Sequence, residues 1–217
     1  MTLIALPGVY APQDDTAILA RALRREALPA EAQVLDIGTG TGALALAAAM
    51  RGARVTAVDV CRPAVWSARL NALLSRTRVR VLRGDLATPV AGRRFDLVVV
   101  NPPYVPSPAP TPPRHGRARA WDAGRDGRAV IDRICREVPA LLGPGGVLLV
   151  VHSALSGVEL TLGRLRAAGL TADVTERHLV AFGPVLRARR SWLCSRGLLG
   201  PGSQAEELVV IRAERTC

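Results

Sequence analysis

Lysine is absent from the 217 residues of this chain, and aromatic residues make up only 3% of it. No apolar run approaches the ~18 residues that a membrane-spanning helix needs, so we expect no transmembrane segment. The opening residues, MTLIALPGVY, lack the basic start, the long apolar stretch and the cleavage site of a signal peptide. These absences predict a protein of the cytoplasm.

Cysteine and histidine are scarce as well. The four cysteines are far apart and none forms a C-x-x-C pair, so we predict no metal site and no disulfide framework: Cys61, Cys135, Cys194 and Cys217. The three histidines show no spacing typical of a metal site or a catalytic triad, and we interpret them as packing or surface residues: His115, His152 and His178.

The chain has fewer acidic residues (18) than basic residues (29), which gives a formal net charge of +11. The use of arginine in place of lysine is typical of a GC-rich genome, but it does not explain the excess. A charge this high favours encounters with polyanions such as RNA, ribosomes or DNA. The arginines are dispersed and no nucleic-acid module is visible, so a merely solvated basic surface is the alternative.

The chain is 49% hydrophobic and of a length that suits one domain with a real core. Strands are expected at 32–38, 53–60, 79–85, 95–101, 145–153, 170–180 and 206–214, and helices at 42–52, 62–76, 126–143 and 157–169. Pro139 should end or bend the third of these helices near Val138. Apolar strands without strict alternation are typical of a sheet that is buried on both faces.

This alternation predicts an α/β fold with a Rossmann-like, doubly wound, mostly parallel seven-stranded sheet whose last strand is antiparallel. We expect a single domain over 1–217. Within it, we expect an N-terminal cap segment (1–30), a proline-rich loop that faces the substrate (102–123) and a basic insertion between the last two strands (183–204).

The first predicted strand runs into the glycine-rich stretch VLDIGTGTGALAL. Gly38, Gly40 and Gly42 allow a tight turn and a close approach of the backbone to a ligand. The string Gly38-x-Gly40-x-x-Ala43 also satisfies the dinucleotide fingerprint, so a dehydrogenase stays open. A turn that merely packs a helix against the sheet is the structural alternative.

Acidic residues at three strand ends favour a different nucleotide-type ligand. Asp36, two residues before the first glycine, would repel a pyrophosphate but attract the cationic amino-acid portion of S-adenosylmethionine (SAM). Asp59 ends the second strand about 20 residues after Gly38, where a carboxylate can accept hydrogen bonds from ribose hydroxyls. Asp85 follows the third strand and could accept from an adenine amino group. Ligands bind beyond the carboxyl ends of strands in such sheets, so we predict a SAM site there.

The fourth predicted strand stops abruptly at Asn-Pro-Pro-Tyr, residues 101–104. The side-chain oxygen of Asn101 and the rigid carbonyl of Pro102 can accept both hydrogens of a planar –NH2 group, and Tyr104 offers a ring for stacking. The nitrogen of such a group is a weak nucleophile, so holding it in line with a methyl donor is the main catalytic help available. We predict these three residues as catalytic, with an ordinary proline turn as the alternative.

Together, DIGTGTG, VDV, GDL and NPPY resemble the class I SAM-dependent methyltransferases that modify planar amino groups. Two further stretches, GVYAPQDDTAILARAL and AWDAGRDGRAVIDRI, resemble the HemK branch of protein-glutamine N5-methyltransferases, in its short form without an N-terminal helical domain. The resemblance covers nearly the whole chain.

This resemblance implies SAM as the cofactor and eight residues that line it: Thr16, Asp36, Gly38, Gly40, Asp59, Asp85, Leu86 and Asn101. It implies substrate contacts from Pro103, Tyr104 and Trp121, with Gly124 near the entrance; for Trp121, packing of the loop is the alternative. The implied substrate is a protein with an exposed glutamine, namely the Gly-Gly-Gln motif of translation release factors. The proline-rich loop and the basic insertion depart from the family pattern and leave room for another protein substrate.

Two other functions stay open at this point. An N6-adenine methyltransferase of DNA or RNA would also carry Asn-Pro-Pro-Tyr, although the chain shows no target-recognition domain. A SAM-binding module without catalysis is the other, and Asn101 and Tyr104 argue against it. Short family members from eukaryotes carry a small zinc-binding partner; the sequence does not decide whether this chain has one, nor its oligomeric state.

Overall fold

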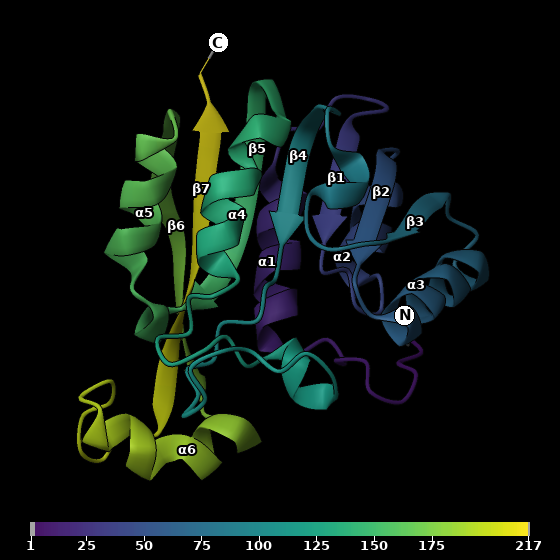
Figure 1. Ribbon diagram of the computed structural model, residues 1–217. Helices are drawn as coiled ribbons and strands as arrows, with labels where there is room; N and C mark the ends of the chain where they lie inside the picture. Colours follow the sequence, from purple (N-terminus) through teal and green to yellow (C-terminus); the bar gives the residue numbers. More distant parts are fainter. Residues whose placement is uncertain (1–2, 217) are drawn as a thin grey trace.

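A seven-stranded sheet in the order β3-β2-β1-β4-β5-β7-β6 forms the centre of the molecule, which is described for residues 3–216 in a computed structural model (Figure 1). Neighbours from β3 to β5 run parallel, and β7 runs antiparallel to both β5 and β6. The strands are β1 (Gln33–Ile37), β2 (Arg54–Asp59), β3 (Val79–Arg83), β4 (Phe95–Val100), β5 (Leu142–Ser153), β6 (Leu170–Ala181) and β7 (Ala205–Arg215). The predicted fold class is confirmed.

Helices cover both faces of this sheet. Figure 1 shows α4 in front of the strands and α1 behind them, and α1 packs on α2 while α4 packs on α5. The helices are α1 (Asp14–Arg25), α2 (Ala43–Ala49), α3 (Arg62–Leu74), α4 (Ile131–Glu137), α5 (Val158–Ala167) and α6 (Pro184–Ser195). In the part of the chain that the structure describes, no helix has the length and apolar character needed to cross a membrane.

The largest departures from the expected elements are three helices. The helix expected at 126–143 is much shorter, because 126–130 form a turn and the helix ends just before Val138 and Pro139, as the proline predicted. The sequence did not predict α1. It also did not predict α6, which lies inside the basic insertion and buries Leu186 and Leu193 between its arginines.

The N-terminal segment has two parts. Residues before α1 are irregular and are tied to α3, where Asn71 Oδ1 accepts from Ile4 N at 2.9 Å and Ser67 Oγ accepts from Leu6 N at 3.0 Å. Helix α1 instead joins the layer behind the sheet. Met1 and Thr2, and also Cys217, lie outside the described residues.

The order of the strands reverses between β1 and β4, which pair with each other at the centre of the sheet. All but one residue of β4 are buried, so the packing of this strand fixes the position of the residues that follow its end. In an open α/β sheet this reversal opens a crevice at the carboxyl ends of the strands.

Candidate active site

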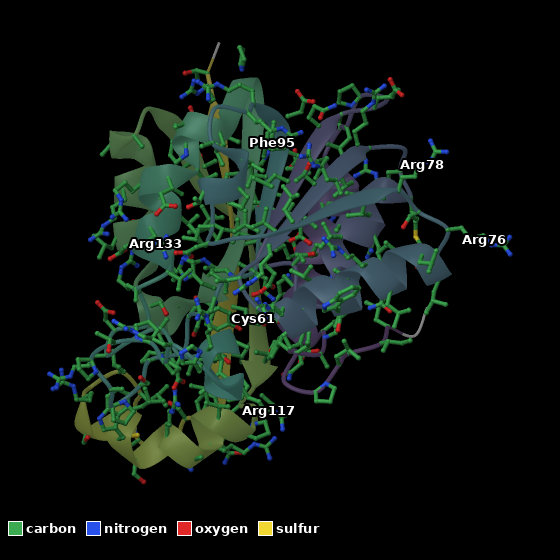
Figure 2. All side chains as sticks on the ribbon, turned by 45° about the vertical axis from the view of Figure 1, so that its right-hand side comes forward. Cys61, Arg76, Arg78, Phe95, Arg117 and Arg133 are labelled. Carbon is green, nitrogen blue, oxygen red and sulfur yellow. The ribbon has the colours of Figure 1, made fainter. Side chains whose placement is uncertain are left out.

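A cavity of about 460 Å³ lies at the carboxyl ends of β1, β2, β3 and β4. Its volume is within the range of small-molecule sites. Figure 2 shows Cys61, which lines this cavity, and Arg117, which belongs to the neighbouring loop, well away from Phe95 at the start of β4. The predicted residues Thr16, Gly38, Gly40, Asp59, Asp85, Leu86, Asn101 and Pro103 all line it.

The glycine turn after β1 forms one wall. Gly38 and Gly40 have φ of +73° and +56°, a region that side chains rarely adopt, so glycine is required there. Asp59 holds this turn, because its Oδ2 accepts from Gly40 N at 2.9 Å and its Oδ1 accepts from Cys61 N at 2.8 Å. Burial raises the pKa of Asp59, and the two N–H groups oppose that shift. A carboxylate has about four acceptor sites, so Asp59 can still accept a hydrogen bond from a ligand hydroxyl.

Asp36 lies one layer behind the cavity wall, so the structure does not place it in direct contact with a bound molecule. Its Oδ2 accepts from Thr39 Oγ1 at 2.6 Å and from Ala45 N at 3.0 Å, which ties the glycine turn to the start of α2. Its Oδ1 is buried and has no hydrogen-bond partner among the described residues. Burial raises the pKa of Asp36 to about 7.

Asp85 lies on the wall but is already paired. Arg133 of α4 holds it with two contacts, Nη1 to Oδ1 and Nη2 to Oδ2, both at 3.1 Å. An adenine amino group would therefore share Asp85 with this guanidinium. Sequence reasoning missed Arg133 because its partner is brought close only by the fold.

The Asn-Pro-Pro-Tyr corner stands where two cavities meet. Asn101 lines the large cavity and also a second, small cavity of about 40 Å³, whose walls include Pro102, Tyr104 and Trp121. One water needs about 10–15 Å³ of such space, so the small cavity has room for a group of a few atoms, such as a planar amide. Asn101 Nδ2 donates to Thr16 Oγ1 at 3.1 Å. Its Oδ1 receives no hydrogen bond from the described chain and is available at the junction.

Tyr104 forms a fixed wall of the small cavity. Its hydroxyl donates to Asp15 Oδ2 at 3.2 Å, and its carbonyl accepts from Ser156 Oγ at 2.8 Å. Burial raises the pKa of Tyr104 well above its ordinary value, so the hydroxyl stays protonated and stays a donor. The ring is thereby held for packing against a planar group.

The proline-rich loop is anchored on both sides. Val105 N donates to Trp121 O at 2.8 Å, which folds the loop back on itself. Arg189 of α6 pairs with Asp122 at 2.5 Å and donates to Pro106 O at 3.0 Å, so the insertion 183–204 presses on this loop. Gly124 is buried inside the loop and lines neither cavity.

Two residues beside the corner were not singled out from the sequence. Tyr10 and Asp15 line the small cavity, and both fall within the stretch that carried the family resemblance. The sequence signal that could have pointed to Asp15 is its position directly before Thr16, a predicted cofactor residue. His152 is fully buried on β5, where burial lowers its pKa to about 4, and it lines neither cavity, so it is a packing residue.

Comparisons with known proteins agree with this geometry. The family described as "Methyltransferase small domain" matches residues 1–111. A protein from Methanocaldococcus jannaschii, named a candidate protein N5-glutamine methyltransferase, is 34% identical over 177 residues, which cover 81% of this chain and 88% of that protein. The chain belongs to the protein N5-glutamine methyltransferase family.

Other relatives of this methyltransferase carry related names. A release factor glutamine methyltransferase from Deinococcus radiodurans is 41% identical over 175 residues, and the match covers 78% of this chain but only 61% of that protein. A 4-amino-L-phenylalanine/4-methylamino-L-phenylalanine methyltransferase from Streptomyces pristinaespiralis is 36% identical over 203 residues, 87% of this chain and 68% of that one.

One solved structure superimposes over nearly the full length of the methyltransferase. It is the E. cuniculi Mtq2–Trm112 complex, responsible for methylation of the translation termination factor eRF1. The TM-score is 0.69 at 25% identity, covering 96% of this chain and 99% of that one.

SAM is the cofactor of this methyltransferase, and the cavity suits it. The glycine turn leaves the backbone open on one side, Asp59 lines the cavity with its carboxylate, and Asp36 lies behind the wall with a buried Oδ1 that has no partner in the described chain. Within residues 3–216, no cluster of three His, Cys, Asp or Glu side chains is arranged to hold a metal ion.

We expect the affinity for SAM to fall as the pH drops below about 7. Without ligand, Asp36 keeps its proton up to its raised pKa of about 7, whereas a nearby ammonium group favours the ionised form. Binding below that pH must therefore release a proton, which weakens affinity by up to about tenfold for each pH unit. Calorimetric titration with SAM from pH 5.5 to pH 8.5 measures this slope.

Asp36→Asn should flatten this slope. Glu206 provides a matched control, because burial also raises its pKa to about 7 but it does not line the large cavity. Glu206→Gln should leave the pH dependence of SAM binding as it is. A slope that persists in Asp36→Asn would show that Asp36 does not sense the cofactor.

Proposed function

We propose that this methyltransferase transfers a methyl group from SAM to the side-chain amide nitrogen of a glutamine in a protein, and that a translation release factor is the substrate. The observation that carries the proposal is the position of Asn101, which lines both cavities and whose Oδ1 accepts no hydrogen bond from the described chain. The names of the relatives support the same acceptor.

The residues of the corner divide the work as follows. Bound SAM supplies an electrophilic methyl group on its sulfonium. Asn101 Oδ1 and the carbonyl of Pro102 accept hydrogen bonds from the two N–H groups of the acceptor amide, which orients the nitrogen lone pair towards the large cavity. The N–CH3 bond forms as the sulfonium–methyl bond breaks, and the nitrogen then loses one of its two protons to water. Tyr104 and Trp121 line the small cavity and enclose the plane of the amide, and Pro103 lines the large cavity on the cofactor side.

The size of the small cavity favours an amide over a nucleic-acid base. At about 40 Å³ it takes the few atoms of an amide group, whereas a purine ring would need several times more room beside Asn101. The arginines do not gather at this mouth alone. Arg76 and Arg78 project into solvent beyond α3, far from Arg117, so a ribosome or nucleic-acid partner stays a prediction from charge (Figure 2). The cytoplasmic location also stays a prediction.

A small arylamine is the second candidate acceptor, because the relative that matches 87% of this chain is named for one. The walls of the small cavity include three aromatic side chains, Tyr10, Tyr104 and Trp121, which can pack against an aromatic ring. The ring of an arylamine needs more room than the cavity of about 40 Å³ offers, so the amide is favoured here as well.

The test uses the purified enzyme, isotopically labelled SAM and three acceptors. These are a release factor, the same factor with the glutamine of its Gly-Gly-Gln motif replaced, and 4-amino-L-phenylalanine. The proposal expects label in the first acceptor only. Equal labelling of the first two, or labelling of the arylamine alone, would contradict it.

A further inference from the structure

Asp15, at the start of α1, is a buried carboxylate that no arginine or histidine of the described chain pairs with. It is 5% exposed. Its Oδ2 accepts from the hydroxyls of Tyr104 at 3.2 Å and Tyr10 at 3.3 Å. Its Oδ1 accepts from Thr16 N at 2.6 Å and from Thr16 Oγ1 at 3.2 Å. A buried charge held only by neutral donors is costly.

The surroundings make that cost larger. Glu206, at the start of β7, is a second buried carboxyl group close enough to interact electrostatically with Asp15. Burial also raises the pKa of Tyr10 and of Tyr104, so both hydroxyls remain protonated and can only donate towards the carboxylate. Packing alone would be served better by an apolar side chain.

The direction of the hydrogen bonds runs from Asn101 to Asp15. A carboxylate can only accept, so Thr16 must spend its single hydroxyl hydrogen on Asp15. Thr16 Oγ1 is then left with lone pairs alone, and it accepts from Asn101 Nδ2 at 3.1 Å. With its NH2 end turned to Thr16, Asn101 presents its carbonyl end, Oδ1, to the junction of the cavities.

We infer that Asp15 is a positioning residue that sets the polarity of the Asn101 amide, through Thr16, so that the site offers an acceptor and not a donor to the incoming –NH2 group. This inference rests on the proposed function only in its need for an –NH2 acceptor, whether an amide or an arylamine. A second arm, through the Tyr104 hydroxyl, holds the ring that packs on that acceptor.

Without Asp15, the Thr16 hydroxyl is free to donate to Asn101 Oδ1. The amide would then turn its NH2 end to the acceptor, and two donors would face each other. Asp15→Ala removes both the contacts to Thr16 and the contact to the Tyr104 hydroxyl. Asp15→Asn removes mainly the tyrosine arm, because the backbone N–H of Thr16 keeps an oxygen at the Oδ1 position.

The test compares turnover, KM for the acceptor, SAM affinity and thermal unfolding for five variants and a control. We expect Asp15→Ala and Thr16→Val each to lower kcat about 100-fold, Asp15→Asn to lower it less, and Thr16→Ser to recover activity relative to Thr16→Val. We call the hydrogen-bonded chain from Asp15 through Thr16 to Asn101 the relay. The double variant Asp15→Ala/Thr16→Val should lose little more activity than either single variant, because both changes break this same relay.

Asp14→Asn is the matched control, since Asp14 is exposed, carries the same charge and lies in the same first turn. It should leave turnover unchanged. The assay runs on a glutamine peptide and on 4-amino-L-phenylalanine. If the wild type methylates only the arylamine, the proposed function fails while the relay is still tested. Folded, SAM-binding Asp15→Ala with wild-type kcat, or losses that add fully in the double variant, would overturn the relay.

Discussion

Replacing Asn101 by alanine is expected to lower kcat for methyl transfer by about 10²–10³-fold while weakening SAM binding only modestly. The change removes one of the two acceptors that orient the –NH2 group, and a misdirected lone pair costs rate and not cofactor affinity. The rest of the large cavity is untouched, because the glycine turn and Asp59 are held by their own hydrogen bonds. Single-turnover methyl transfer at saturating SAM measures the loss.

Two measurements keep this result interpretable. Calorimetry with SAM reports whether the cofactor site survives, and denaturant unfolding reports whether the loss of the contact between Asn101 and Thr16 loosens the fold. Turnover that stays at the wild-type level in a folded Asn101→Ala enzyme would refute the role of this corner.

Gly127→Ala is expected to destabilise the protein by about 2–4 kcal/mol and to disturb the catalytic corner. Gly127 has φ of +72°, and an added Cβ would lie 2.3 Å from Tyr104 O and 2.6 Å from Ser156 Oγ. The positive φ costs about 1 kcal/mol or more, and forcing the backbone carbonyl of Tyr104 away adds an overpacking cost of about 1–3 kcal/mol. The free energy of unfolding in urea measures the sum.

Gly169→Ala separates these two contributions. Gly169 has φ of +83° and nothing within 4 Å of an added Cβ, so it carries the conformational cost without the clash. We expect a loss of about 1 kcal/mol there, with methyl transfer unaffected. If both variants lose the same stability and Gly127→Ala keeps full activity, then the contact between Gly127 and Tyr104 contributes neither to stability nor to methyl transfer.

The sheet was predictable because its signals are local. The central parallel strands β1 and β4 contain short apolar runs, and the strand ends that line the cavity are marked within two or three residues, as at Asp59 and Asn101. Pro139 likewise ends its helix by its own covalent geometry. Such features need no knowledge of what lies beside them in space.

The rest of the site depends on contacts between distant residues. Tyr104 and Asp15 are 89 residues apart in the sequence, and Arg189 and Pro106 are 83 apart. No local pattern marks such pairs, so the relay behind Asn101 and the anchoring of the loop by α6 were not predictable. For Asp36, the sequence predicted its position at the end of a strand, but it could not show that the side chain is buried behind the wall of the large cavity.

Tandem mass spectrometry of a release factor incubated with the enzyme and SAM tests the central claim most directly. The account predicts a mass gain of one methyl group on the glutamine of the Gly-Gly-Gln motif, located on the side-chain amide nitrogen, and an initial rate of this gain lowered about 10²–10³-fold with Asn101→Ala. A methyl group on any other residue, or an unmodified glutamine beside active transfer to another acceptor, would contradict it.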